Sequence, residues 1–207
     1  MTNFMKELKP DCLEDIIAGV SLYRPGPMDQ IPRYIANKKD PEHAVYTHPA
    51  LKPILEVTYG CMVYQEQVMQ IVRDLAGYSL GRADLVRRAM GKKKLDVMAK
   101  EREIFINGQL DENGNIVVPG CVRNGIDAES ANKIFDEMAE FAKYAFNKSH
   151  AAAYAVVSYR TAYLKAYYPA EFMAATLNSF LGNLDKIPDY IEAVSYTHLR
   201  AHETAAN

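Results

Sequence analysis

The cations of this chain gather in two stretches. Residues 73–102 carry nine Lys and Arg against four Asp and Glu, and residues 141–170 carry four cations and no acid. Because the formal charge of the whole chain is -2, the remaining residues together carry a charge of -11. Two basic stretches on an otherwise acidic chain predict an anionic ligand held at one face. A solvated helix end would explain either stretch alone, so the prediction depends on there being two.

The second stretch has the richer chemistry. Residues 141–150 alternate aromatic side chains with cations, an amide and a hydroxyl, just before a predicted helix. Free amides at the helix N-terminus, beside Lys148 and Ser149, would form a cradle for an anion. Four further side chains recur at helical spacing: His150, Tyr154, Thr161 and Lys165. A packed helix whose alanines, 151–153, allow close approach to a neighbour explains this pattern equally well.

The sequence contains neither a metal-binding cluster nor a phosphate-binding loop motif. Gly91-Lys92 does not fit the P-loop pattern, because Val86 occupies the position of a required glycine and no Ser or Thr follows the lysine. The histidines stand apart, and Glu101 and Glu103 point to different faces of a helix, so no group has metal-ligand spacing. The residues therefore predict phosphate binding without a metal centre, and spacing assigns no catalytic residue.

The elements that must position these residues are predicted to be helices, which makes the fold class mainly α. Asp11 is expected to cap the first helix, and Gly77, Ser79 and Asp127 are expected to mark later helix ends. Pro169 suits the first turn of the last helix. The helices are predicted over 12–23, 65–76, 80–90, 95–108, 127–144, 149–168 and 170–180.

Two other regions are expected to be irregular or extended. Prolines punctuate residues 24–58, which predicts short helices and loops, and residues 59–63 fit either a brief strand or an extended entry to the next helix. Asp111–Gly114 is a turn sequence followed by Ile116–Val118, which predicts a small β-hairpin near residues 111–118.

Composition places the chain among ordinary globular proteins. It has 207 residues, of which 49% are hydrophobic and 24% are charged, which excludes disordered, collagen-like and disulfide-stapled classes. No apolar run approaches the ~20 residues that cross a bilayer, and the polar start does not resemble a signal peptide. Three widely spaced cysteines favour a reducing compartment, so we expect a cytoplasmic location without membrane contact.

Long segments of the chain resemble, in order, the alpha subunit of bacterial DNA polymerase III, the replicative C-family polymerase. The resemblance extends over about residues 5–193. The segments are LYRPGPM (22–28), YTHPALKPILEVTYGCMVYQEQVMQI (46–71), LAGYSLGRADLVRRAMGKKK (75–94), IFDEMAEFAKYAFNKSHAAAYAVVSY (134–159) and AYLKAYYPAEFMAA (162–175).

This resemblance implies that the chain is the multi-helical fingers region of a DNA-directed DNA polymerase, a nucleotidyltransferase of DNA replication. The fingers close over the incoming nucleotide and bind the primer-template. By this resemblance the triphosphate is held by Arg87, Arg88 and Lys92. The surroundings of the nucleotide and the primer-template junction are formed by Tyr144, Asn147, Lys148, His150 and Tyr154. DNA contacts are implied for Lys93, Lys94, Lys143 and Lys165.

The resemblance also implies which partners the segment has. Two Mg²⁺ ions are held by palm aspartates upstream of this chain, so no metal ligand or catalytic residue is expected here and the segment alone is expected to be inactive. The implied partners are dNTP, primer-template DNA, the palm and thumb of the same subunit, and the other subunits of the replicase holoenzyme.

Two domain assignments follow. Residues 1–193 are interpreted as a fingers region truncated at both ends. Residues 194–207 depart from the family and look like a translated sequencing-adapter sequence, so we expect them to be a non-native tail. The alternative to an enzyme segment is a stand-alone basic helical module that binds nucleic acid without catalysis. The affinity of such a module for nucleic acid would depend only on salt concentration and backbone charge. A fingers region would instead bind a primer-template with its matched nucleotide more tightly than other nucleic acids.

Overall fold

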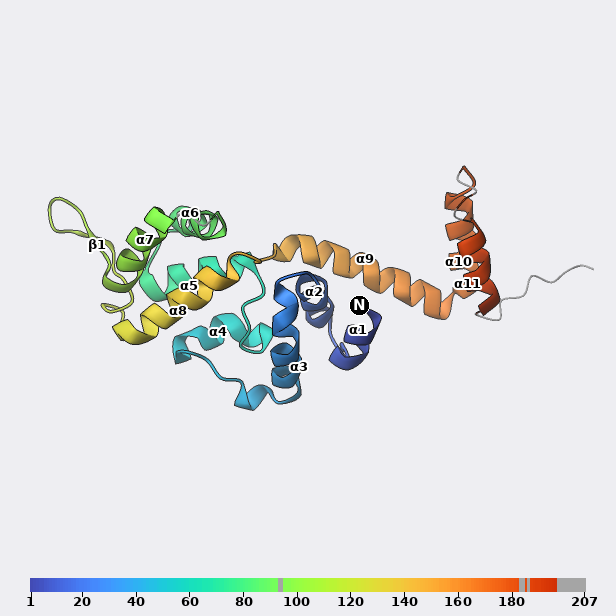
Figure 1. Ribbon diagram of the computed structural model, residues 1–207, viewed down its shortest axis with the longest axis horizontal. Coiled ribbons are helices and arrows are strands. Elements are labelled where there is room, and N and C mark those ends of the chain that lie inside the picture. The colour runs from blue at the N-terminus through green and yellow to red at the C-terminus, as the bar shows by residue number, and fades with distance from the viewer. Residues whose placement is uncertain (93–94, 183–184, 186, 197–207) are drawn as a thin grey trace, which may run out of the picture. The chain divides into compact units, whose positions relative to one another are not determined.

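The computed structural model describes residues 1–92, 95–182, 185 and 187–196. Over these residues it contains eleven α-helices and one antiparallel pair of strands, which confirms the mainly α prediction and its small hairpin (Figure 1). The chain divides into two compact units, Met1–Ala155 and Val156–Asn207. None of the described helices combines the length and the apolar character that crossing a membrane requires.

The first unit consists of helices, short 3₁₀ turns and the hairpin. Its α-helices are α1 (Thr2–Leu8), α2 (Leu13–Leu22), α3 (Ile31–Lys39), α4 (Lys52–Leu55), α5 (Gln65–Ala76), α6 (Leu80–Gly91), α7 (Leu95–Asn107), α8 (Ala128–Phe141) and the first turns of α9 (Lys148–Tyr167). The 3₁₀ turns are η1 (Pro27–Gln30), η2 (Pro41–His43), η3 (Pro49–Leu51) and η4 (Glu56–Thr58), and each lies in the proline-punctuated region or at its end.

Local signals place several helix ends correctly. Helix α5 ends at Gly77, which has a φ of 77° that suits glycine. The side chain of Ser79 accepts a hydrogen bond from the Arg82 amide at the start of α6. Asp127 does the same for the Ser130 amide at the start of α8. Each cap satisfies an amide that the helix itself leaves unpaired.

The start of the chain departs from the predictions. Helix α1 was not predicted, and the N-cap of α2 is Cys12 rather than Asp11. The Asp11 amide instead donates to Oδ2 of Asp15 at 3.1 Å, and Lys38 approaches the same Oδ2 at 2.7 Å. Asp15 is therefore the acceptor at this helix end, because a buried carboxylate needs partners that a solvent-exposed one does not.

The first unit has two clusters of buried apolar side chains. One joins α4–α8 and the hairpin, and within it the rings of Phe105 and Phe135 lie 5.7 Å apart. The other joins α1–α3 to Tyr64 and to Ala151 and Ala155 of α9. Fully burying a large apolar side chain contributes about 1.5–3 kcal/mol, so both clusters stabilise the unit. The second cluster fixes the first turns of α9 against α2 and α3.

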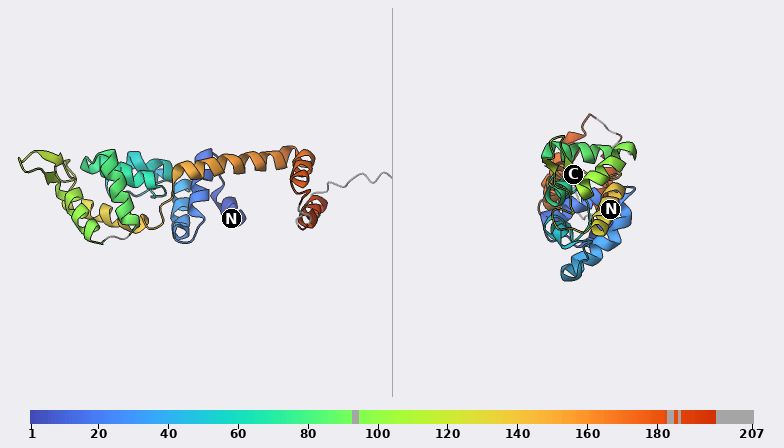
Figure 2. Two further views of the ribbon diagram at one scale, coloured as in Figure 1. Left: turned by 90° about the horizontal axis from the view of Figure 1, so that it is seen from above. Right: turned by 90° about the vertical axis from the view of Figure 1, so that its left-hand side faces the viewer.

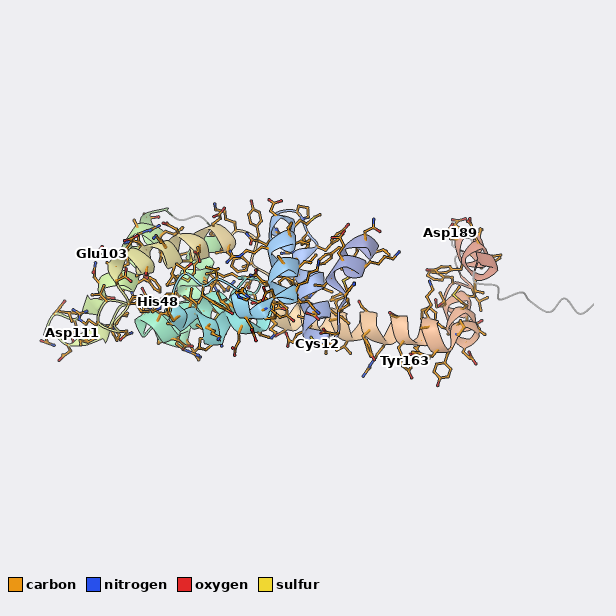
Figure 3. The ribbon with its side chains drawn as sticks, turned by 90° about the horizontal axis from the view of Figure 1, so that it is seen from below. Cys12, His48, Glu103, Asp111, Tyr163 and Asp189 are labelled. Atoms are coloured by element: carbon orange, nitrogen blue, oxygen red, sulfur yellow. The ribbon has the colours of Figure 1, made fainter. Side chains whose placement is uncertain are left out.

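The hairpin extends from the helices of the first unit, as Figure 1 and the left view of Figure 2 show. Strand β1 (Gln109–Leu110) pairs with β2 (Ile116–Val118), with Gln109 opposite Val118. Oδ1 of Asp111, labelled in Figure 3, accepts hydrogen bonds from the Asn113 and Asn115 amides. The turn is thus closed by its own aspartate, as turn sequences of this type allow.

The second unit contains the remainder of α9, then α10 (Pro169–Ser179) and α11 (Ile187–Tyr196). Pro169 stands in the first turn of α10, as predicted. Helices α10 and α11 pack together, and the rings of Phe180 and Tyr190 stack with their centroids 5.0 Å apart. Residues 197–207, most of the predicted non-native tail, lie outside the described part of the chain, so that interpretation stays a prediction.

Candidate functional site

The two basic stretches approach one another at the C-terminal end of α6. A Cβ built on Gly91 would lie 3.6 Å from the carbonyl oxygen of Ala142, in the loop 142–147 that joins α8 to α9. This α8–α9 loop also runs beside the start of α5, where Tyr64 and Phe146 form an isolated parallel bridge. The segment 59–63 is therefore not a strand of a sheet: Tyr59 and Gly60 form a turn with positive φ, and residues 61–63 lead from it into α5.

Gln65 connects the two basic stretches directly. Its Oε1 accepts a hydrogen bond from Nη1 of Arg87 at 3.0 Å, and its Nε2 donates to the carbonyl of Ala145 at 3.1 Å. Its backbone amide donates to the carbonyl of Phe146 at 2.8 Å. One side chain at the first position of α5 thus holds an arginine of α6 and the α8–α9 loop in a fixed relation.

Arg87 and Arg88, the arginine pair, share one carboxylate. Nε and Nη2 of Arg87 donate to Oδ1 of Asp84 at 3.0 and 2.6 Å, and Nε of Arg88 lies 2.8 Å from Oδ2. These hydrogen bonds, those from Arg87 foremost, hold the pKa of Asp84 below its usual value, so the carboxylate is ionised at neutral pH. Each guanidinium has five N–H donors, so both arginines keep donors for a further anion while Asp84 orients them.

The N-terminus of α9 is already occupied by groups of the chain. The carboxylate of Glu66 accepts from the Lys148 amide at 3.1 and 3.2 Å and from Nδ2 of Asn147 at 3.0 Å. The side chain of Asn147 accepts from the His150 amide at 2.8 Å. The prediction that free amides here form a cradle for an anion is therefore wrong for the amides of Lys148 and His150, because they already donate to Glu66 and Asn147.

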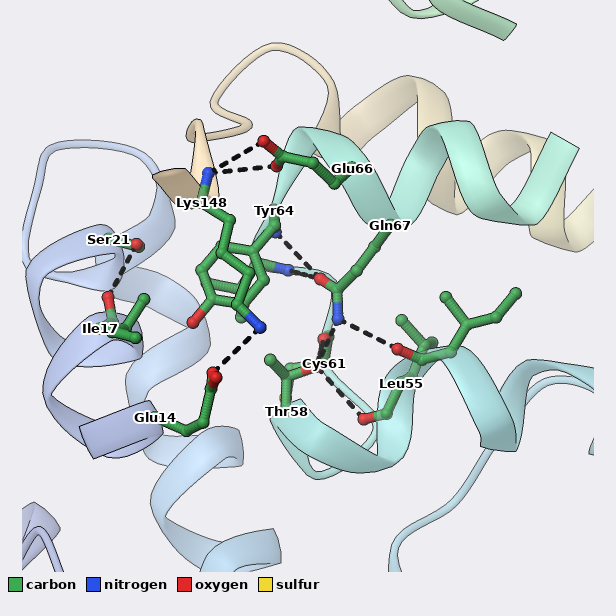
Figure 4. A network of polar contacts seen from close by, with 12 residues as sticks. Glu14, Ile17, Ser21, Leu55, Thr58, Cys61, Tyr64, Glu66, Gln67 and Lys148 are labelled. Carbon is green, nitrogen blue, oxygen red and sulfur yellow. Dashed lines mark hydrogen bonds and ion pairs between the residues drawn. The ribbon is translucent and has the colours of Figure 1, made fainter. Parts of the chain in front are cut away.

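The Lys148 side chain turns toward α2. Its Nζ lies 3.1 Å from Oε2 of Glu14 and 5.2 Å from the centre of the Tyr64 ring, and Figure 4 shows it between these two residues. Burial raises the pKa of the Tyr64 hydroxyl, so this tyrosine is neutral and offers its ring to the ammonium. An anion that binds Lys148 must therefore compete with Glu14.

The motif Arg24–Met28 supports the α8–α9 loop from the other side. Nη2 of Arg24 donates to the carbonyl of Tyr144 at 2.8 Å, and its guanidinium lies 4.1 Å from the centre of the Phe146 ring. Burial lowers the pKa of Arg24. Gly26 has a φ of 102°, and a Cβ there would lie 2.2 Å from the Tyr144 ring. The glycine is required both by its backbone conformation and by the ring packed on it.

The other residues singled out in the sequence are open to solvent or lie elsewhere. The His150 ring contacts Phe146 and Tyr154, at centroid distances of 5.4 and 4.7 Å, and both His150 and Tyr154 are exposed. Lys92 and Lys143 are exposed and have no ion pair among the described residues. Lys165 belongs to the second unit. Lys93 and Lys94 lie outside the described residues.

Four residues that position this site were not singled out in the sequence: Arg24, Gln65, Glu66 and Asp84. Asp84 has a local signal, since an acid three and four residues before two arginines forms helix ion pairs. Gln65 and Ala145 have none, because they are separated by 80 residues and only the tertiary fold brings them together.

A polar cavity of about 350 Å³ opens beside Tyr144. Its lining includes Arg33, but also three acids, Asp29, Glu137 and Glu140. Acidic side chains repel phosphate, so this cavity does not suit a phosphate-bearing ligand.

One group of metal-ligating side chains is close enough to hold an ion among the described residues: Asp11, Cys12 and Asp15. Nζ of Lys38 lies 3.1 Å from Asp11 and 2.7 Å from Asp15, so an ammonium already neutralises both carboxylates. Mg²⁺ prefers an all-oxygen octahedral shell, which this group does not provide. The site as a whole has N–H donors left over for an anion, and it has no group suited to metal catalysis among the described residues.

The family model and the relatives that match this sequence all concern one kind of protein. The sequence model of one protein family, described as "Bacterial DNA polymerase III alpha subunit finger domain", matches residues 1–113. The chain is 52% identical to the DNA polymerase III subunit alpha of Xylella fastidiosa over 200 residues, and 53% identical to that of Pasteurella multocida over 197. These alignments cover 97% and 90% of the chain but 16% of each relative. The Pseudomonas aeruginosa protein of the same name is 49% identical over 207 residues, and the chain spans 17% of it.

Proposed function

Because the chain belongs to the family of bacterial DNA polymerase III alpha subunits, with the finger domain matching its first 113 residues, we propose that it binds the incoming dNTP and the primer-template in a replicative DNA polymerase. The reaction is template-dependent transfer of a deoxynucleotide to a primer. The observation that carries this proposal is Gln65, which joins Arg87 to the α8–α9 loop and so makes one site from the two basic stretches.

In this proposal the arginine pair binds the triphosphate. Each planar guanidinium can donate two parallel hydrogen bonds to phosphate oxygens, which fixes the orientation of the phosphate as well as its position. Asp84 holds both arginines from one side and leaves their remaining donors to the ligand. Lys92, at the end of the same helix, adds positive charge beside them.

The α8–α9 loop and the first turns of α9 surround the rest of the nucleotide. Exposed Tyr144, His150 and Tyr154 provide aromatic faces for a base or sugar, and Asn147 and Lys148 lie between them. The exposed lysines Lys143 and Lys165, with Lys93 and Lys94, are assigned to DNA phosphates. Binding of the matched nucleotide would close the helices and align its α-phosphate for attack by the primer hydroxyl.

Catalytic metal ions are assigned to residues outside this chain. The Asp11, Cys12 and Asp15 group does not suit Mg²⁺, because Lys38 already occupies it. The palm of the same subunit would provide the carboxylates for two Mg²⁺ ions, which stabilise the charge that develops during phosphoryl transfer. The other proposed partners are the thumb and the remaining replicase subunits.

This chain alone is therefore expected to be inactive. A primer-extension assay with the 207-residue chain, primed template, nucleotides and Mg²⁺ should give no product. Measurable extension would mean that the metal ligands are in this chain, and it would overturn the assignment of the metal to the palm.

The nucleotide role is tested by Arg87→Ala and Arg88→Ala in a full-length alpha subunit that carries this segment. Each change removes charge-assisted hydrogen bonds worth about 1.5–3 kcal/mol, so the KM for dNTP should rise by about tenfold or more. Arg73→Ala is the matched control, because Arg73 is a partly exposed arginine of the neighbouring helix α5 that also pairs with an aspartate, Asp74. If KM is unchanged in both α6 variants, these arginines do not bind the triphosphate and are only charged surface residues.

A further inference from the structure

A row of exposed tyrosines follows the part of α9 that lies in the second unit. All residues from Val157 to Tyr168 are exposed in the described structure. Tyr159, Tyr163, Tyr167 and Tyr168 are 55%, 44%, 69% and 50% exposed, and together we call them the tyrosine face. Tyr163 is labelled on α9 in Figure 3. Three of these rings lie on α9 and the fourth, Tyr168, follows directly as the N-cap of α10, so the four together are more than scattered surface hydrophobics.

The rings form a continuous series. The centroids of Tyr159 and Tyr163 are 6.4 Å apart, those of Tyr163 and Tyr167 are 4.6 Å apart, and those of Tyr163 and Tyr168 are 6.4 Å apart. Residues 159, 163 and 167 are each one turn of helix apart, so the series extends about 12 Å along α9. This length matches a short run of nucleotides, whose bases stack about 3.4 Å apart.

The exposed part of α9 carries positive charge, and the next acid along the chain is Glu171 in the first turn of α10. No acid occurs between residues 141 and 170, whereas Arg160 and Lys165 lie within the exposed part of α9. Neither cation has an ion-pair partner in the part of the chain that the structure describes. Position 160 lies one turn before position 163 or 164 on the helix, so Arg160 borders the tyrosine face, and its charge is available to a phosphate.

We propose that the tyrosine face binds single-stranded DNA by stacking, with Arg160 contacting the backbone. Aromatic side chains next to cations, without acids, are the combination that binds single strands regardless of sequence, because every base has a face on which to stack. An apolar protein segment would gain nothing from Arg160 and Lys165, so the charge of this part of α9 favours the nucleic acid. This inference rests on the proposed function, and it identifies the ligand of a second surface as the unpaired template strand.

The test uses a full-length alpha subunit that carries this segment, with fluorescein-labelled oligo-dT as the single strand. Fluorescence anisotropy measures its binding to the parent, to Tyr159→Ala/Tyr163→Ala/Tyr167→Ala, and to the same triple substitution with Phe. Stacking is worth about 1–3 kcal/mol per base, so the Ala variant should bind at least fivefold more weakly. The Phe variant should stay within about twofold, since it keeps the rings. Tyr23→Ala removes an exposed tyrosine elsewhere and should change nothing.

Two results would overturn the inference: equal binding of oligo-dT by the parent and the Ala variant, and equal losses in the Ala and Phe variants. If unchanged binding came with a lowered melting temperature of the Ala variant, the tyrosines would pack against another part of the polymerase. Failure of the proposed function looks different, because the parent would then bind neither a primer-template duplex nor dNTP.

Discussion

Gln65 stands at the first position of α5 and makes three hydrogen bonds, to Arg87, Ala145 and Phe146. The arginine pair is oriented on one side by Asp84, and Arg87 is oriented on the other by Gln65. A guanidinium held at two edges loses less rotational freedom when a phosphate binds, so much of the entropy of ordering is lost before the ligand arrives. Gln65 and Asp84 are therefore expected to position the arginines without contacting the nucleotide.

Gln65→Ala should raise the KM for dNTP by about fivefold, since the net worth of one such hydrogen bond is about 1 kcal/mol. The turnover number should change little, because the substitution removes an aid to binding and leaves the reacting groups in place. Steady-state incorporation of a single nucleotide measures both constants.

The matched control is Gln70→Ala, because Gln70 is an exposed glutamine of the same helix. If Gln65→Ala and Gln70→Ala give the same KM as the parent, Gln65 does not position Arg87 for the ligand.

At the scale of elements, the α8–α9 loop is held by parts of the chain that are far away in sequence. Arg24 binds the carbonyl of Tyr144, Gly26 makes room for the Tyr144 ring, and Glu66 caps the start of α9. The loop thus has three supports, from the segment before η1 and from α5. A loop fixed in this way presents its side chains in one arrangement, which precise positioning of a ligand requires.

Gly26→Ala should disturb the site through the loop. Its φ of 102° strains any residue with a Cβ, and that Cβ would lie 2.2 Å from the Tyr144 ring. We expect a loss of stability of about 1–3 kcal/mol from backbone strain, a further loss from the displaced ring, and weaker nucleotide binding. Thermal unfolding and the KM for dNTP measure the two effects.

Gly125→Ala is the control that has the backbone strain of Gly26→Ala without its steric clash. Gly125 has a φ of 85°, and nothing lies within 4 Å of its Cβ position. This variant should lose stability and keep the parent's KM. Equal KM values in the Gly26 and Gly125 variants would contradict the support that Gly26 gives to Tyr144.

Local sequence signals predicted the elements better than their assembly. Gly77, Ser79 and Asp127 mark helix ends correctly, because capping depends on residues within one turn. Asp11 failed as a cap because Asp15 accepts its amide, and Asp15 is buried with Lys38, which lies 23 residues further along the chain. Contacts of that range have no local pattern.

The site shows the same division. Its charge was evident from the sequence, and the resemblance to a polymerase family suggested which residues would contact the ligand. The supports of the site were not evident, since Gln65 and Glu66 contact a loop about 80 residues away. In the sequence, Gln65 and Glu66 are only two polar residues in the first turn of a helix, where polar side chains usually face solvent.

At the scale of the whole molecule, the central claim is that two stretches far apart in sequence form one site. The chain spans 16–17% of the relatives it matches, so the site must be tested in a full-length subunit that carries this segment. We choose Arg87 as the residue to substitute in the first stretch and the exposed His150 as the residue to substitute in the second. Their substitution by alanine is compatible with folding, because neither side chain is fully buried.

The most direct measurement is a double-mutant cycle on kcat/KM for dNTP with Arg87→Ala and His150→Ala. Residues that share one ligand couple by about 0.5–3 kcal/mol, so the double variant should differ from the sum of the single variants by at least about 0.5 kcal/mol. The control cycle combines Arg87→Ala with His43→Ala, a substitution of an exposed histidine, and the effects of these two substitutions should be additive. Additivity of Arg87 and His150 within about 0.3 kcal/mol would contradict the claim that the two stretches hold one nucleotide.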